Sequence, residues 1–175
     1  MRQWTAASVL LAGIASASLL AQAPARDNEK MKPAAATSPA FEQIKALAGE
    51  WEGKVQGSPA QTSFRVVSAG SAVMNLLKPE NEPEMVTMFH LDGSALMVTH
   101  YCSAGNQPRM VAASASNPKV ITFTFKDVTN LASPTAGHMR GLVLTMVDAD
   151  HHTQQWTFRQ DGKDQAEVFE FTRKE

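Results

Sequence analysis

The residues of this chain that could do chemistry gather in one stretch, residues 85–110. It reads MVTMFHLDGSALMVTHYCSAGNQPRM and holds two of the five histidines and the only cysteine. His100 and Cys102 stand two positions apart, so on a β-strand they share one face, and an imidazole with a thiolate can bind zinc or copper. Two ligands do not close a metal site. His138 and Met139 are the most suitable further donors.

The same pair has two other interpretations. Free cysteine is among the most buried residue types, so Cys102 can be a small core residue beside His100, a hydrogen-bonded core histidine. A catalytic role for Cys102 requires a base that lowers the pKa of its thiol. The surrounding sequence carries no nucleophile signature.

A polar loop follows the cysteine. Asn106, Gln107 and Arg109 offer amide groups and a guanidinium that could hold a carboxylate or another polar ligand head at the rim of a cavity. The alternative is that Gly105 and Asn106 form a turn while Arg109 pairs with a neighbouring acid. The sequence leaves both possibilities open.

Asp92-Gly93 predicts a two-residue hairpin turn within the stretch. In the register that this turn implies, Phe89 lies opposite Leu96. His90 then points to one face of the hairpin, while His100 points to the other with Cys102. A site in a barrel interior could therefore use only one of the two histidines.

Around this stretch, hydrophobic residues alternate with polar ones and turn residues recur at short intervals, which is typical of antiparallel β-structure. Ser38-Pro39 predicts the start of a short helix over Phe41–Ala48. We predict an all-β fold, a single antiparallel up-and-down β-barrel of about 8–10 strands with a short N-terminal helix, which can enclose one small ligand. The predicted strands are Trp51–Gln56, Thr62–Ser68, Ala72–Lys78, Met85–Leu91, Ser94–Cys102, Arg109–Ala113, Val120–Lys126, Met139–Val147, Thr153–Arg159 and Glu167–Arg173.

The front of the chain resembles an export signal. Met1–Ala25 has a basic start, an apolar run and a small-x-small cleavage site, and it is too short and rich in Ala and Ser for a membrane span. We expect residues 26–37 to form a flexible linker, residues 38–175 to form the barrel domain, and the protein to be exported, periplasmic or secreted. The formal net charge of -1 argues against nucleic acid and anionic membrane surfaces as partners.

Leu47-Ala-Gly-Glu-Trp-Glu-Gly53 resembles the Gly-x-Trp opening of the lipocalins and the wider calycin barrels. In that superfamily a short helix closes one barrel end, and an arginine of the last strand packs across the tryptophan. The resemblance implies that Gly49, Trp51 and Arg173 form this structural closure. It also implies a lumen that binds a small, partly apolar molecule.

Two further resemblances to known proteins imply no activity for this chain. Thr99-His-Tyr-Cys102, Gly105–Arg109 and Gly137-His-Met139 resemble a group of exported bacterial proteins with a domain of unknown function. Trp51-Glu-Gly53 is similar to the opening of nitrobindin-type haem barrels, which bind iron through a histidine near the C-terminus. This chain has no histidine after His152, so the likeness supplies no iron ligand and the cofactor stays unknown.

The leading hypothesis is therefore a non-enzymatic barrel that binds a small-molecule ligand with His100, Cys102, Asn106, Gln107, Arg109 and His138. The alternative is a metal- or cofactor-dependent enzyme centred on His100, Cys102 and His138.

Overall fold

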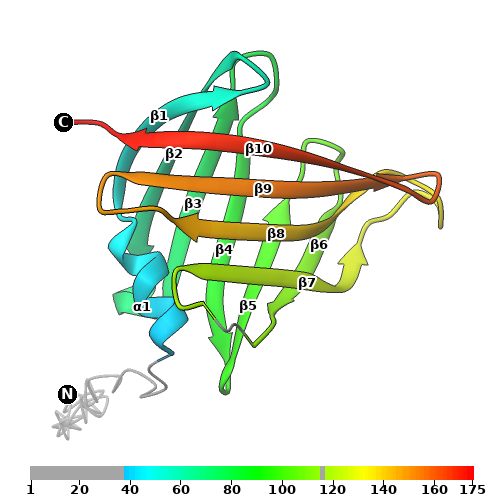
Figure 1. Cartoon of the computed structure of the whole chain (residues 1–175). Coiled ribbons are helices and arrows are strands. Elements are labelled where there is room, and N and C mark those ends of the chain that lie inside the picture. Colours follow the sequence, from blue (N-terminus) through cyan, green and yellow to red (C-terminus); the bar gives the residue numbers. More distant parts are fainter. Residues whose placement is uncertain (1–37, 115–116) are drawn as a thin grey trace, which may run out of the picture. The chain divides into compact units, whose positions relative to one another are not determined.

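A computed structural model describes residues 38–114 and 117–175, so the predicted signal peptide and linker lie outside the described residues. The described chain forms one short α-helix, a 3-10 turn and ten strands that close into a barrel (Figure 1). The elements are α1 (Pro39–Ala46), β1 (Gly49–Val55), β2 (Ser58–Val67), η1 (Ser68–Gly70), β3 (Ala72–Pro79), β4 (Met85–Asp92), β5 (Ala95–Tyr101), β6 (Gln107–Ala112), β7 (Val120–Thr129), β8 (His138–Met146), β9 (His151–Gln160) and β10 (Lys163–Arg173).

The barrel has the simplest antiparallel topology. Each strand pairs with the next along the chain, and β1 pairs with β10 to close the ring. Closure leaves no unpaired strand edge in the ring, which removes a site of aggregation. The predicted fold class is confirmed, and each of the ten predicted strands corresponds to one observed strand.

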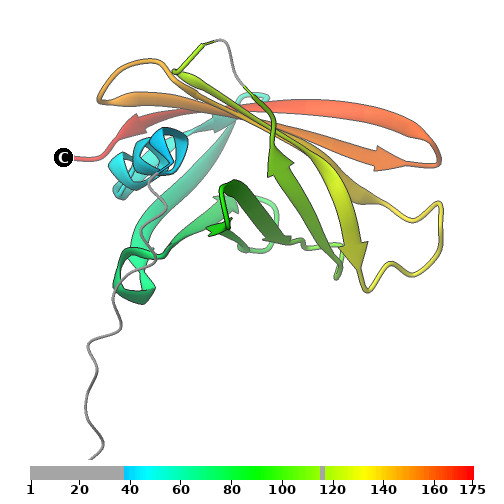
Figure 2. The ribbon, with the colours of Figure 1, turned by 90° about the horizontal axis from the view of Figure 1, so that it is seen from below.

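Helix α1 covers one end of the barrel (Figures 1 and 2). Pro39 occupies its first turn, and Ser38 holds the extended N-cap position, although its side chain makes no capping hydrogen bond. Phe41 and Ile44 are buried and join the barrel core together with Leu47. In the described part of the chain, no helix has the length and apolar character that crossing a membrane requires.

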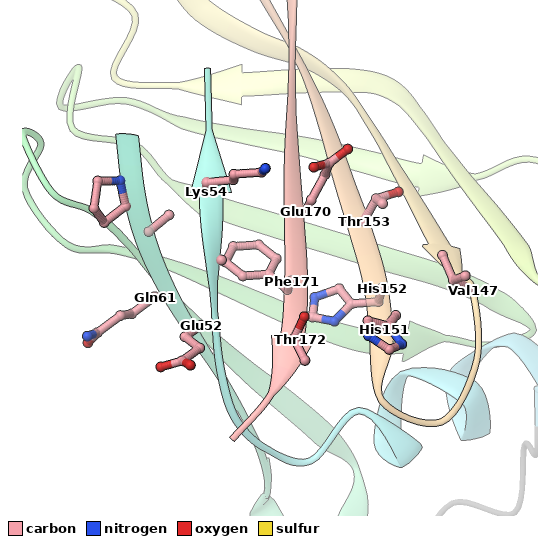
Figure 3. Close-up of a pocket in the computed structure, with 13 residues that line it drawn as sticks. Glu52, Lys54, Gln61, Val147, His151, His152, Thr153, Glu170, Phe171 and Thr172 are labelled. Atoms are coloured by element: carbon pink, nitrogen blue, oxygen red, sulfur yellow. The ribbon is translucent and has the colours of Figure 1, made fainter. Parts of the chain in front are cut away.

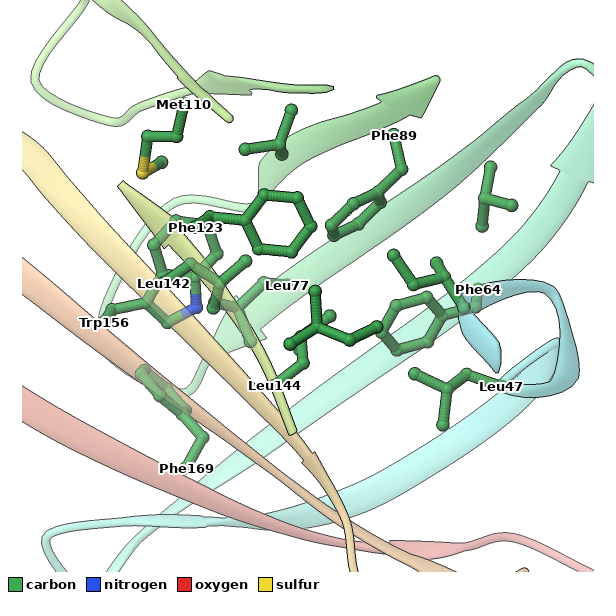
Figure 4. Packing of buried hydrophobic residues seen from close by; sticks show 14 of the residues in the cluster. Leu47, Phe64, Leu77, Phe89, Met110, Phe123, Leu142, Leu144, Trp156 and Phe169 are labelled. Atoms are coloured by element: carbon green, nitrogen blue, oxygen red, sulfur yellow. The ribbon is translucent and has the colours of Figure 1, made fainter. Parts of the chain in front are cut away.

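The interior is filled by side chains from alternate positions of the strands (Figure 4). The rings of Phe64 and Phe89 lie 6.4 Å apart and those of Phe89 and Phe123 lie 5.6 Å apart, which links β2, β4 and β7 across the core. Leu142 and Leu144 of β8 are fully buried beside them. Each such side chain contributes roughly 1.5–3 kcal/mol to folding.

The hairpin between β4 and β5 corrects one prediction. Phe89 lies opposite Val98, not Leu96, and Asp92 lies opposite Ala95. The two turn residues are Gly93 and Ser94, and Gly93 has a φ of 60°, as a turn with glycine at its first central position requires. The predicted register was wrong by two residues along the partner strand. An even shift keeps every side chain on its predicted face.

Arg173 of β10 packs across Trp51 of β1. The guanidinium of Arg173 lies 4.1 Å from the ring centroid of Trp51, and it donates hydrogen bonds to the carbonyl oxygens of Ala48, Ala46 and Ala149 at 3.0–3.3 Å. The Trp51 indole donates to the carbonyl of Leu47 at 2.9 Å. One arginine therefore joins the end of α1, the start of β1 and the loop between β8 and β9.

We predict that Arg173→Lys lowers the free energy of unfolding by about 2 kcal/mol, because an ammonium cannot donate to three carbonyls and stack on the indole at once. Urea unfolding followed by tryptophan fluorescence measures the change. Arg65→Lys, at an exposed position of β2, is the matched control and should change stability by less than about 0.5 kcal/mol. Equal effects of the two substitutions would contradict this role of Arg173.

Candidate functional site

A pocket of about 350 Å³ lies at the barrel end opposite α1. The strand order places the turns that follow β1, β3, β5, β7 and β9 at this end. We call it the mouth pocket. Its walls come from β3, β4, β8, β9 and β10 and from the loops that follow β3 and β5, through the residues Leu77, Glu82, Met85, Cys102, Ser103, Ala104, Met139, Trp156, Phe158, Gln165, Glu167 and Phe169.

The wall of the mouth pocket is apolar and rich in aromatic rings and sulfur. Trp156 and Phe169 are buried and form its inner part, while Phe158 is half-buried nearer the opening. Met85 of β4 and Met139 of β8 also line the pocket. Flexible thioethers and flat rings adapt to apolar ligands of different shape.

The polar part of the mouth pocket is acidic. Glu82 comes from the loop between β3 and β4, and Glu167 from the part of β10 that pairs with β9 but not with β1. The Glu167 carboxylate accepts a hydrogen bond of 2.9 Å from Gln56. A smaller hollow of about 160 Å³ lies beside the pocket and is lined by the same two glutamates and by Glu80. Among the described residues that line the mouth pocket, none is basic.

Cys102 is the one sequence-predicted ligand residue that lines this pocket. It is a half-buried free thiol. Burial raises the pKa of this thiol, hydrogen bonds with Ala104 and Ser103 oppose the rise, and the negative charge of Glu82 adds to it. A thiol held in its neutral form is a poor nucleophile, so the geometry supports an apolar wall position for Cys102.

His100 lies deeper, on β5 two residues before Cys102, and has no exposed surface. Its ring centroid is 4.5 Å from that of Trp156, and its Nδ1 shares a hydrogen bond of 2.9 Å with the Thr87 hydroxyl. Burial lowers the pKa of His100 to about 4, so the imidazole is neutral at pH 7. Its Nε2 has no protein hydrogen-bond partner. His100 therefore lies beneath the mouth pocket, behind the indole ring of Trp156.

A second buried histidine belongs to the same interior, and the sequence did not indicate it. The predicted strand Thr153–Arg159 starts two residues later than the observed strand β9. The observed strand begins at His151 and turns His152 inward. Its ring lies 4.4 Å from Trp51 and 5.1 Å from Phe171. Burial, with a smaller contribution from the charge of Arg173, lowers the pKa of His152 to about 3.

Amide and hydroxyl groups connect this histidine to the pocket wall. The Trp156 indole donates to Oε1 of Gln154 at 3.2 Å, and the Gln154 amide lies 3.4 Å from Nε2 of His152. The same amide is 3.5 Å from the Thr62 hydroxyl, which accepts a 2.6 Å hydrogen bond from Asn75. Oδ1 of Asn75 and Nδ1 of His152 have no protein partner. Buried polar atoms of this kind are usually satisfied by water or ligand.

The predicted rim loop does not line the mouth pocket. Asn106 is buried and donates to the carbonyl of Gly137 at 2.8 Å, which ties the loop after β5 to the loop before β8. Gln107 accepts from the Thr129 hydroxyl at 2.9 Å. Arg109 is exposed and forms a two-point ion pair with Asp127 at 2.5 and 2.6 Å. Of the two possibilities for Arg109, the structure shows pairing with an acid.

His138 does not join His100 and Cys102. It pairs in register with Arg159, on the face of β8 opposite Met139, and its ring lies 5.3 Å from Phe125. Its Nδ1 contacts the carbonyl of Ala136 at 2.8 Å. Within residues 38–114 and 117–175, no three His, Cys, Asp or Glu side chains gather as a metal site.

A larger hollow, of about 870 Å³, lies over the outer surface of β1, β9 and β10 (Figure 3). Exposed side chains of both charges surround it, among them Glu52, Lys54 and Glu170. The adjacent turn holds His151 paired with Asp148 at 2.8 Å. This hollow is more open than the mouth pocket, and its mixed charge favours no class of ligand.

A scan against protein-family models and a search of curated proteins found no match. A search of solved structures found 12 matching chains. One is the crystal structure of Rv2717c from M. tuberculosis, with a TM-score of 0.52 and 16% sequence identity over 79% of this chain and 99% of that chain. This likeness supports the barrel fold.

We predict that acid destabilises the barrel through its buried histidines. An unfolded histidine titrates near 6.5, so between about pH 6.5 and pH 4 the unfolded chain binds protons that folded His100 and His152 do not bind. The free energy of unfolding is then highest above about pH 6.5 and falls as the pH drops through this window. For His152 alone the loss between pH 7 and about 4.5 is on the order of 2 kcal/mol.

His152→Phe isolates this effect, because a phenyl ring suits the cluster of Trp51 and Phe171 and cannot bind a proton. Urea unfolding at pH 7 and at about 4.5 should show a smaller loss in the variant than in the native protein. Carboxylates titrate in both proteins, so the difference between the two losses reports His152. Equal losses would contradict the prediction.

Proposed function

We propose that this protein is an exported, non-enzymatic barrel that binds a small, partly apolar molecule in its mouth pocket. The pattern of residues 1–25 supports export, and the closed barrel with one covered and one open end supports a lumen that receives a ligand. The observation that carries the proposal is the pocket of about 350 Å³ with aromatic and thioether walls. This volume lies in the range of small-molecule sites.

The geometry also indicates how a ligand would lie. Its apolar part would pack between Met85 and Met139 and reach Trp156, and its polar end would face the opening beside Glu167. His100 stays behind the indole ring and is not part of the contact surface. The metal-dependent alternative gains no support, since His138 lies on another face of its strand.

Cys102 gives a direct test, because it is the only thiol of the chain and lines the pocket. We predict that saturating 1-octanol slows alkylation of Cys102 by N-ethylmaleimide about 10-fold or more, since a bound chain covers the sulfur. The rate is followed by mass spectrometry. The urea-unfolded protein is the control and should react at one rate with or without octanol. An unchanged rate in the folded protein would contradict binding at this site.

We also predict that Met139→Trp weakens octanol binding about 10-fold or more, because the larger ring fills the pocket. Isothermal titration calorimetry measures the affinity. Met88→Trp is the matched control, since Met88 pairs with Met74 and alternates with the inward-facing residues of β4. It should bind like the native protein. Equal weakening by both substitutions would place the ligand elsewhere.

A further inference from the structure

We propose that the mouth pocket selects organic cations, so that its ligand is an apolar molecule with an alkylammonium group. This inference rests on the proposed function and adds the charge of the ligand. It follows from two features of the same pocket: aromatic rings that form its wall, and carboxylates that form its rim.

The aromatic wall suits a cation. Trp156, Phe158 and Phe169 line one side of the pocket from the adjacent strands β9 and β10. The face of an aromatic ring carries partial negative charge and attracts quaternary ammonium groups. Phe158 presents such a ring nearer the opening, while Trp156 and Phe169 offer apolar contact deeper in the pocket. The thioethers of Met85 and Met139 complete a wall that is polarisable and carries no formal charge.

The acidic rim of the pocket complements the positive charge of an ammonium ligand. Glu82 and Glu167 both line the pocket, and Glu80 lies in the adjoining hollow that shares them. Three arginines of the described chain are engaged outside the pocket, Arg109 with Asp127, Arg159 with Asp164, and Arg140 over the ring of Phe125. A carboxylate ligand would meet like charge at this rim, while an ammonium would meet opposite charge.

Three ligands that carry an eight-carbon chain distinguish the effect of charge on affinity from the effect of apolar contact. They are octyltrimethylammonium, 1-octanol and octanoate. Isothermal titration calorimetry on the native protein should give an affinity for the cation at least about 10-fold above that for octanoate, with octanol between them. Because exposed charges are screened by salt, the ratio should fall between about 20 and 500 mM NaCl. Octanol affinity should change little over this range.

The double variant Glu82→Gln with Glu167→Gln should reduce the ratio of cation to anion affinity to within about 3-fold and leave octanol binding unchanged. Glu84→Gln is the matched control in the same loop, because Glu84 lines a separate hollow with Arg65 and Lys78. It should keep the native ratio. Thermal unfolding of each variant confirms that the barrel is intact.

The outcomes distinguish this inference from the proposed function. If octanol binds and the three ligands show equal affinities, or octanoate binds best, the cation selectivity is overturned and the binding function stands. If the cation is preferred but the double variant keeps the preference, the assigned carboxylates are overturned. If none of the three ligands binds, the proposed function fails together with the inference.

Discussion

The pairing of β1 with β10 is the contact on which the rest of the barrel depends, because it converts a ten-strand meander into a closed ring. Trp51 faces Arg173 across this pair, and Gly53 faces Phe171. A Cβ at Gly53 would lie 1.9 Å from the carbonyl oxygen of Glu170, so only glycine permits this close approach. The Trp-Glu-Gly sequence thus carries a structural requirement of closure.

Closure also encloses one polar cluster in an otherwise apolar interior. Phe64, Phe89 and Ile44 are fully buried. Among such side chains, hydroxyl, amide and imidazole groups join Asn75 to His152. The Trp156 indole donates to Gln154 of the same cluster. Because unpaired buried polar groups are costly, this hydrogen bond helps to fix the position of Trp156, the inner wall of the mouth pocket.

Most of the fold could be predicted, because strand burial imposes a period of two on the sequence. The faces of β4 and β5 were right even though their register was wrong, since a shift by two residues preserves the face. The mouth pocket could not be predicted. Glu82, Met139 and Glu167 lie far apart in the sequence and meet only through closure. The sequence left two possibilities open for Arg109, because Asp127, with which it pairs, lies 18 residues away on the next strand.

Charge is also distributed unevenly between the interior and the mouth. Burial keeps His100 neutral, and it lowers the pKa of His152 to about 3, so these two histidines supply no positive charge at pH 7. At the end that α1 covers, Arg173 stacks on Trp51 and pairs with Asp150 at 3.4 Å. At the other end Glu82 and Glu167 line the mouth pocket, and none of its described lining residues is basic. A ligand with a positive end, as proposed above, would therefore have that end at the opening and its apolar end against Trp156.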